Sequence, residues 1–148
     1  MIIGGGVEQV PAYQRAKDRG FSILGTDINP NAPALKFADY VLQVSTKNAE
    51  ETAFKAKEFD KKIKIDGVMT IANDVPHTVA MVANKLNLPG ISIESALIAS
   101  DKLLMKNTFK MKDVPCPWFS EVKSEKELKS LTSDRENQKY VIKPTDGS

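Results

Sequence analysis

The sequence predicts an α/β protein built on an open, mostly parallel β-sheet with helices on both faces. A short apolar strand, three glycines, a helix and a second strand ending at Asp27 follow one another at the start of the chain. This order is a βαβ unit. Strands and helices keep alternating up to about residue 98, and residues 67–72 are apolar almost throughout, as in a strand buried on both faces of a parallel sheet.

The first strand and helix are predicted at residues 1–3 and 7–19. Pro11 falls in the first turn of this helix, where proline is tolerated, and Gly20 suits the position just after its end. Val10, Tyr13 and Ala16 lie on one side of the helix at helical spacing. The second strand follows at residues 21–26.

The third strand is predicted at residues 39–44, after a loop rich in proline and asparagine. Asn48, with Glu51 three residues later, forms a capping-box pattern that starts the next helix. The strand at residues 67–72 comes after this helix. The last two elements of this part are a helix and a strand, at residues 79–86 and 91–93.

The character of the chain changes after residue 98. A helix is predicted over residues 100–112, and Ser124 with Glu127 gives a second capping-box pattern for a helix that ends near residue 131. Short strands are expected before and after this second helix, at residues 118–122 and 140–143. The predicted domains are an α/β domain, a helical linker and the beginning of an α+β domain, at residues 1–98, 99–114 and 115–148.

Composition excludes several classes of function. The 148 residues carry a net charge of +2, so no strong attraction to nucleic acid or to an anionic membrane is implied. No apolar run is long enough to span a bilayer. The single cysteine cannot form an internal disulfide and fits a reducing cytoplasm, and one cysteine with one histidine cannot form a metal cluster.

Three loops are expected at the carboxyl edge of the sheet, where ligands bind in folds of this kind. The first contains Gly4 and Gly6, which fit a dinucleotide fingerprint, whereas Gln9 stands where that fingerprint has its last glycine. Asp27 lies where the ribose-binding acid would be. The alternative to a dinucleotide site is that the three glycines form a turn needed only to pack a strand against a helix. The loops span residues 4–8, 27–31 and 73–77.

Two lysines could contact phosphates. Lys102 lies in the first turn of its helix, where a cation is disfavoured by the helix dipole, so it either has another role or is a surface lysine offset by Asp101. Lys143 ends a predicted strand and precedes a small polar loop, although many ordinary strands end this way. For His77, proton transfer and a plain capping or surface role both remain open.

Eight short motifs follow one another along the chain. They are Gly4-Gly5-Gly6, the run at 25–33, Ala38-Asp39, Asn73-Asp74, Leu88-Pro89-Gly90, Asp101-Lys102, the run at 114–117 and the run at 141–148. Each is loose alone, but their order and spacing together are fairly specific, and over the whole chain they resemble the ATP-grasp ligases. The similarity is strongest to the carbamoyl-phosphate-synthase large-subunit-like group, which includes biotin-carboxylase-like enzymes.

The resemblance implies a Rossmann-like pre-ATP-grasp domain followed by an incomplete ATP-grasp subdomain. It implies ATP-binding roles for Lys102, Lys143, Thr145, Asp146, Gly147 and Ser148. It implies that the acceptor substrate is faced by Gly5, Gly6, Glu8, Asp27, Asn29, Asn73, Asp74 and His77. The Mg²⁺ ligands and the catalytic residues of the family are expected outside this chain.

The activity implied by the resemblance is that of a ligase. ATP phosphorylates a carboxylate, and an amine then displaces phosphate from the acyl phosphate, with Mg²⁺ assisting. The partners are small-molecule carboxylates and amines, and a homodimer or a partner chain could complete the ATP-grasp domain. The chain alone is expected to be an inactive fragment. The alternatives are an NAD(P)-binding domain of an oxidoreductase and a non-catalytic metabolite-binding module.

Overall fold

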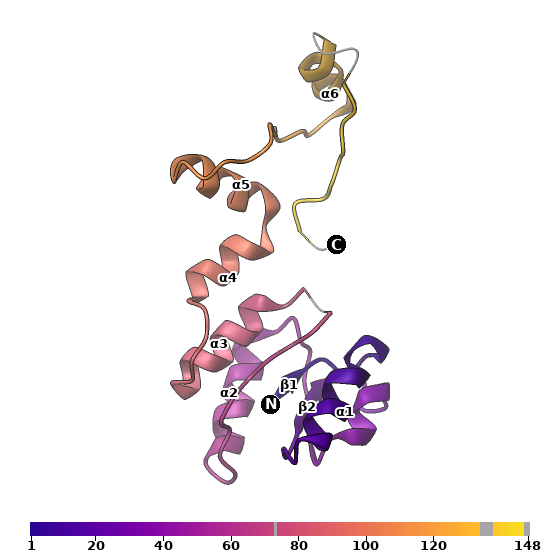
Figure 1. Ribbon diagram of the computed structural model, residues 1–148, viewed down its shortest axis with the longest axis vertical. Coiled ribbons are helices and arrows are strands. Elements are labelled where there is room, and N and C mark those ends of the chain that lie inside the picture. The colour runs from indigo at the N-terminus through magenta and orange to yellow at the C-terminus, as the bar shows by residue number, and fades with distance from the viewer. Residues whose placement is uncertain (73, 134–137, 147–148) are drawn as a thin grey trace. The chain divides into compact units, whose positions relative to one another are not determined.

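The computed structural model describes residues 1–72, 74–133 and 138–146. The chain forms two compact units, unit 1 (Met1–Ser100) and unit 2 (Asp101–Ser148) (Figure 1). The three-part division predicted from the sequence, with a separate linker, stays a prediction.

Unit 1 contains a parallel sheet in the strand order β1-β2-β3. Its strands are β1 (Ile2–Ile3), β2 (Leu24–Asp27) and β3 (Tyr40–Gln43). Because neighbouring residues of a strand point to opposite faces, Ile2 and Ile3 enter two different apolar cores. The predicted α/β fold with a parallel sheet is confirmed.

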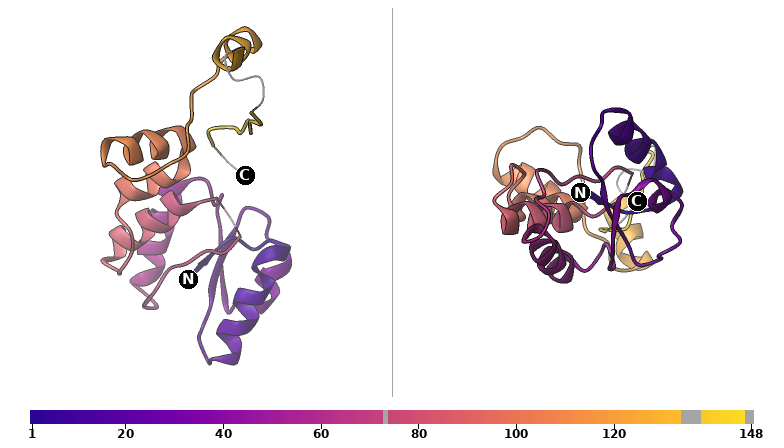
Figure 2. Two further views of the ribbon diagram at one scale, coloured as in Figure 1. Left: turned by 45° about the horizontal axis from the view of Figure 1, so that its top comes forward. Right: turned by 90° about the horizontal axis from the view of Figure 1, so that it is seen from below.

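Helices cover both faces of this sheet (Figure 1 and Figure 2). On one face, Tyr13 and Leu35 pack with Ile2 and Ile23 in one core. On the other face, Val82 and its neighbours pack with Ile3 and Leu24 in the second core. The first face has η1 (Val7–Gln9), α1 (Val10–Asp18) and η2 (Pro33–Phe37), and the second has α2 (Ala49–Asp60) and α3 (Pro76–Leu86).

The strand predicted at residues 67–72 is wrong. Only Met69 pairs with β1: Ile3 N–H donates to Met69 O at 2.8 Å, and Met69 N–H donates to Met1 O at 3.1 Å. The Thr70 hydroxyl donates to Ile3 O at 2.7 Å, so a side chain occupies the acceptor that the next ladder bond would use. Met69 is also 45% exposed, so this segment is not buried on both faces.

The strand predicted at residues 91–93 is also wrong, because a helix, α4 (Ile93–Ser100), begins there. The Ser92 hydroxyl accepts a hydrogen bond from Ser95 N–H at 3.0 Å and so satisfies a free donor of the first turn. The predicted cap of α2 is confirmed, since Glu51 N–H donates to the Asn48 side chain at 3.1 Å.

Unit 2 contains two capped helices. In α5 (Lys102–Met111), Leu104 N–H donates to the Asp101 carboxylate at 2.8 Å. In α6 (Glu125–Thr132), Glu127 N–H donates to the Ser124 hydroxyl at 3.2 Å, as the capping-box pattern predicts. Within the described residues we find no helix with the length and apolar character that crossing a bilayer would need.

Neither of the strands predicted in unit 2 is formed. Residues 118–122 and 138–144 are irregular, and Val141 and Ile142 are 80% and 71% exposed. A strand needs a hydrogen-bonding neighbour, and the described part of unit 2 contains no other strand that could supply one. The prediction that Lys143 ends a strand is therefore wrong.

One buried hydroxyl in unit 1 has no hydrogen-bond partner among the described residues. Thr26 is fully buried in β2, and its Oγ1 makes no hydrogen bond to any residue that the structure describes. Thr78 in α3 is also buried, but its hydroxyl donates to Thr46 O at 2.6 Å. Valine has nearly the same shape as threonine and lacks the hydroxyl. Replacing each of the two threonines by valine therefore tests a hydroxyl without a bond against a hydroxyl with one.

We expect Thr26→Val to raise the free energy of unfolding by about 1 kcal/mol, because it removes a buried polar atom that makes no bond. The control, Thr78→Val, should lower it by a similar amount, because Thr46 O loses its donor. Urea unfolding of the full chain measures both. Loss of stability in Thr26→Val would show that this hydroxyl does have a partner in solution.

Candidate functional site

The loops that follow β1 and β2 are joined by the carboxylate of Asp27. One carboxylate oxygen accepts Gly5 N–H at 2.9 Å, and the other accepts Asn29 N–H at 2.9 Å. The Asn29 side chain in turn accepts Asn31 N–H at 3.0 Å. The structure therefore brings Gly5 and Asp27 together, and both oxygens of Asp27 bond to the backbone of unit 1.

The glycine loop is packed closely against its neighbours. Gly4 has a φ of 100°, in the region that favours glycine. A Cβ atom on Gly5 would lie 2.9 Å from Ala32 Cβ and 2.9 Å from Leu35 Cγ, which is too close for either contact. Gly5 O accepts Ala34 N–H at 2.8 Å. The alternative of a glycine turn needed for packing is thus supported by the geometry.

Tyr13 holds this loop from the side of α1. Its side chain is fully buried, and its hydroxyl donates to Gly4 O at 2.9 Å. Burial raises the pKa of the Tyr13 hydroxyl, so the hydroxyl stays a donor at pH values where an exposed tyrosine would ionise. Sequence reasoning placed Tyr13 on the apolar side of a helix and missed this bond; a phenol among smaller apolar residues was the available signal.

Gln9 connects the glycine loop to the segment after Met69. Its side chain is buried, and Nε2 donates to Ile71 O at 2.7 Å and to Ala72 O at 3.3 Å. Ala72 has a φ of 46°, a left-handed conformation that costs about 1–2 kcal/mol for a residue with a Cβ atom. In the sequence, Gln9 was noticed only as a departure from the dinucleotide fingerprint.

The other predicted substrate-facing residues lie on the surface of unit 1. Glu8 follows the glycines in η1 and is exposed, and Asp74 is exposed shortly before α3. His77 is partly exposed in the first turn of α3. Asn73 lies outside the described residues. No hydrogen bond between the described residues joins His77 to Asp74, so its proton-transfer role stays a prediction.

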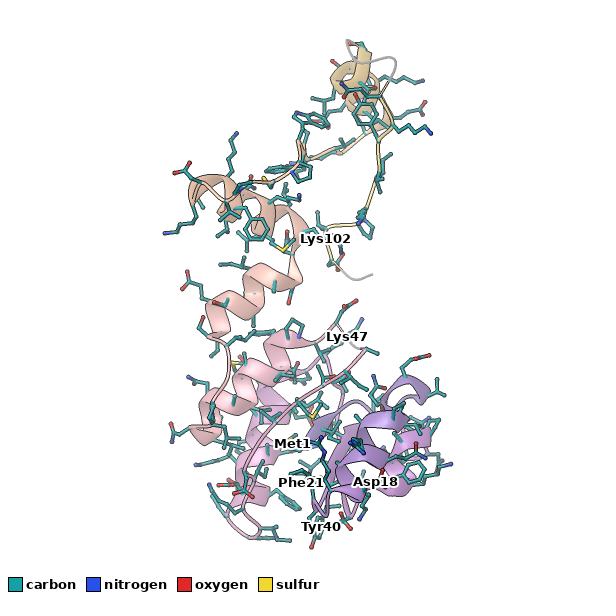
Figure 3. The ribbon with its side chains drawn as sticks, viewed as in Figure 1. Met1, Asp18, Phe21, Tyr40, Lys47 and Lys102 are labelled. Carbon is teal, nitrogen blue, oxygen red and sulfur yellow. The ribbon has the colours of Figure 1, made fainter. Side chains whose placement is uncertain are left out.

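In unit 2, the start of α5 contacts the segment after Lys143. The backbone N–H of Lys102 donates to Thr145 O at 2.7 Å, so two of the predicted ATP-binding residues lie side by side. Figure 3 labels Lys102 at the beginning of its helix. Lys143, Thr145 and Asp146 are exposed, and Gly147 and Ser148 lie outside the described residues.

Two pockets lie away from these residues. In unit 1, a pocket of about 530 Å³ opens where the strands begin, at the opposite edge of the sheet from the Asp27 loop. Its wall includes Met1, Phe21 and Tyr40, which are labelled in Figure 3. In unit 2, a pocket of about 300 Å³ lies beside α5. Neither pocket contains a predicted site residue.

The described residues offer no metal centre. Across residues 1–72, 74–133 and 138–146, no three His, Cys, Asp or Glu side chains are placed to hold an ion together. Among the predicted site residues, the exposed polar side chains are those of Glu8, Asn29 and Asp74 in unit 1 and of Lys143, Thr145 and Asp146 in unit 2.

A family model described as the PylC-like N-terminal domain matches residues 1–93. No curated protein matches the chain significantly. Phosphoribosylglycinamide synthetase from Anaerococcus prevotii is similar to it, with 31% identity and a TM-score of 0.68, over 90% of this chain and 33% of that protein.

Two further solved structures establish the fold at lower identity. L-amino acid ligase from Bacillus licheniformis has a TM-score of 0.69 at 21% identity, over 99% of this chain and 36% of its own. N5-carboxyaminoimidazole synthetase from Staphylococcus aureus, complexed with ADP, has a TM-score of 0.69 at 18% identity. The match covers 99% of this chain and 38% of that protein. These neighbours are ATP-grasp ligases, and the chain spans between a third and two fifths of their lengths.

We expect Gly5→Ala to lower the free energy of unfolding by about 1–3 kcal/mol, because the new methyl group would overlap Ala32 and Leu35. Gly67→Ala is the matched control, because nothing lies within 4 Å of the added Cβ atom. Urea unfolding midpoints of the two variants give the comparison. Equal stability would mean that the loop is open enough to accept a side chain.

Proposed function

Because the chain belongs to the PylC-like N-terminal domain family, we propose that it is the N-terminal part of an ATP-dependent carboxylate–amine ligase. The observation that supports this best is the similarity to phosphoribosylglycinamide synthetase. That similarity covers 90% of the chain, so it must extend past the 100 residues of unit 1 into unit 2.

The proposed reaction has two steps. A carboxylate oxygen of the first substrate attacks the γ-phosphorus of ATP, which gives an acyl phosphate and ADP. The amine of the second substrate then attacks the acyl carbon, the C–O bond to phosphate breaks, and an amide, inorganic phosphate and a proton are released. Positive charge near the transferred phosphoryl group is the main requirement for the first step.

Unit 2 would supply part of that charge. Lys102 and Lys143 are the proposed phosphate contacts, and the hydrogen bond between Lys102 N–H and Thr145 O supports their acting as one site, because Thr145 is only two residues past Lys143. We propose that Thr145, Asp146, Gly147 and Ser148 continue the nucleotide-binding segment.

The described residues do not fit a Mg²⁺ site, since they place no group of three candidate ligands together. We propose that its ligands, and the groups that act on the reacting atoms, lie outside this chain. The chain alone is then expected to bind ATP weakly and not to turn it over. A carbamoyl-phosphate-synthase-like subtype, a cytoplasmic location and assembly with a second copy or a partner chain belong to the same proposal.

Unit 1 is proposed to face the acceptor substrate. Gly5, Gly6, Asp27 and Asn29 would shape this surface, since Asp27 ties the loops together through their backbone. Exposed polar side chains at the same edge are suited to a small polar acid or amine. They are Glu8, Asn29, Asp74 and His77.

The NAD(P)-binding alternative is less compatible with this geometry. It requires the Asp27 carboxylate to accept ribose hydroxyls and the glycine N–H groups to face pyrophosphate. Here Gly5 N–H, one of the glycine donors, points to the Asp27 carboxylate and not toward a site for pyrophosphate. A metabolite-binding module remains the second alternative; thermal shifts with metabolites and none with ATP in the whole protein would favour it.

We expect the product of the whole coding region to bind ATP and to show no saturable binding of NADH. Lys143→Ala and Lys102→Ala should each weaken ATP binding about 10- to 100-fold, because each removes a charged contact to phosphate. Lys139→Ala is the control, because Lys139 is an exposed lysine close to Lys143 in the sequence. Isothermal titration calorimetry measures all of these affinities.

Tight NADH binding with no ATP binding would contradict the ligase proposal and favour the oxidoreductase alternative. Unchanged ATP affinity in both lysine variants would leave the family assignment standing and remove these two residues from the site.

A further inference from the structure

Gln9 is a buried polar side chain that the proposed reaction does not use. It is 5% exposed, and its Nε2 donates to two successive carbonyls, Ile71 O at 2.7 Å and Ala72 O at 3.3 Å. These two carbonyls lie 62 and 63 positions after Gln9 in the sequence. The side chain therefore connects the start of the chain to the segment that leaves the sheet beside β1.

The position of Gln9 is itself held by the glycine loop. Its backbone N–H donates to Gly6 O at 3.1 Å, which closes the η1 turn. A Cβ atom on Gly6 would lie 2.9 Å from Gln9 Oε1. The side chain thus passes directly over Gly6, and a larger residue there would push its amide away from the two carbonyls.

The segment at Ile71 and Ala72, whose carbonyls accept these hydrogen bonds, needs a contact of this kind to keep its conformation. Ala72 has a left-handed φ of 46°, which residues with a Cβ atom rarely adopt. Residues 71 and 72 belong to no helix and to no strand, so a regular hydrogen-bond ladder does not hold them. The bonds from Gln9 are contacts that favour this conformation over the extended one.

We propose that Gln9 is a positioning residue, which holds Ala72 in its left-handed conformation and so directs the chain toward Asp74 and His77. Glu8, the neighbour of Gln9, is exposed at the same glycine loop. The bond therefore joins the segments that directly adjoin two of the loops assigned to the acceptor substrate. Its importance for a substrate rests on the proposed function; the bond and its conformational effect do not.

The sequence provides a natural reporter for the test, because His77 is the single histidine and Trp118 the single tryptophan. In NMR spectra of the full chain, the imidazole Cε1–H signal reports the start of α3, and the indole signal reports unit 2. The Cα and Cβ chemical shifts of Ala72, which depend on its backbone φ and ψ, give a second, local measurement.

Gln9→Glu keeps the shape of the side chain and removes both N–H donors. We expect a shifted His77 signal and Ala72 backbone chemical shifts that move toward those of an extended residue, with the Trp118 signal unchanged. Gln14→Glu is the matched control, because Gln14 is an exposed glutamine in α1. An unshifted His77 signal and unchanged Ala72 chemical shifts in Gln9→Glu would overturn the proposal.

A second substitution separates positioning from a general loss of packing. Ala72→Gly removes the conformational cost at residue 72, so in the double variant with Gln9→Glu the His77 signal should return most of the way to its normal position. A general packing defect would not be rescued in this way, and absence of rescue would contradict the proposal.

If Gln9→Glu does not fold, Gly6→Ala gives the answer, because its methyl group displaces the Gln9 amide without changing the amide itself. It should move the His77 signal in a folded protein, and an unmoved signal would contradict the proposal. None of these measurements uses a ligand, so failure of the ligase proposal would not affect their outcome.

Discussion

The arrangement of unit 1 at the carboxyl edge of its sheet depends on the carboxylate of Asp27. By accepting both Gly5 N–H and Asn29 N–H, it fixes the loop after β1 against the loop after β2. Gly5 can approach this closely only because it has no Cβ atom, since Ala32 and Leu35 fill the space beside it. The glycines therefore serve packing, and the surface left for a ligand is made of exposed side chains.

Local signals in the sequence were sufficient for much of the fold. The caps at Asn48 and Ser124 and the helical spacing of apolar residues predicted α2 and α6, because these signals lie within one or two turns. The alternation of strands and helices predicted the parallel sheet. Strands whose existence depends on a distant partner were predicted less well.

The errors have specific causes. Residues 140–143 favour a strand by composition, but the described part of unit 2 has no strand beside them. Residues 67–72 pair only at Met69, because the Thr70 hydroxyl takes the next acceptor. The Ser92 cap turned a predicted strand into the start of α4. The role of Gln9 could not be predicted, because its partners lie more than 60 positions away. The backbone bond between Lys102 and Thr145, two residues that the resemblance assigns to ATP binding, was not predicted either.

The most direct test of the central claim is to trap the acyl phosphate with hydroxylamine in the product of the whole coding region. The protein would be incubated with ATP, Mg²⁺ and a panel of amino acids and other small carboxylic acids. The ligase account predicts a hydroxamate that requires both ATP and one particular acid, with one ADP released for each hydroxamate formed. Release of ADP that no acid stimulates, with no hydroxamate from any acid, would contradict it.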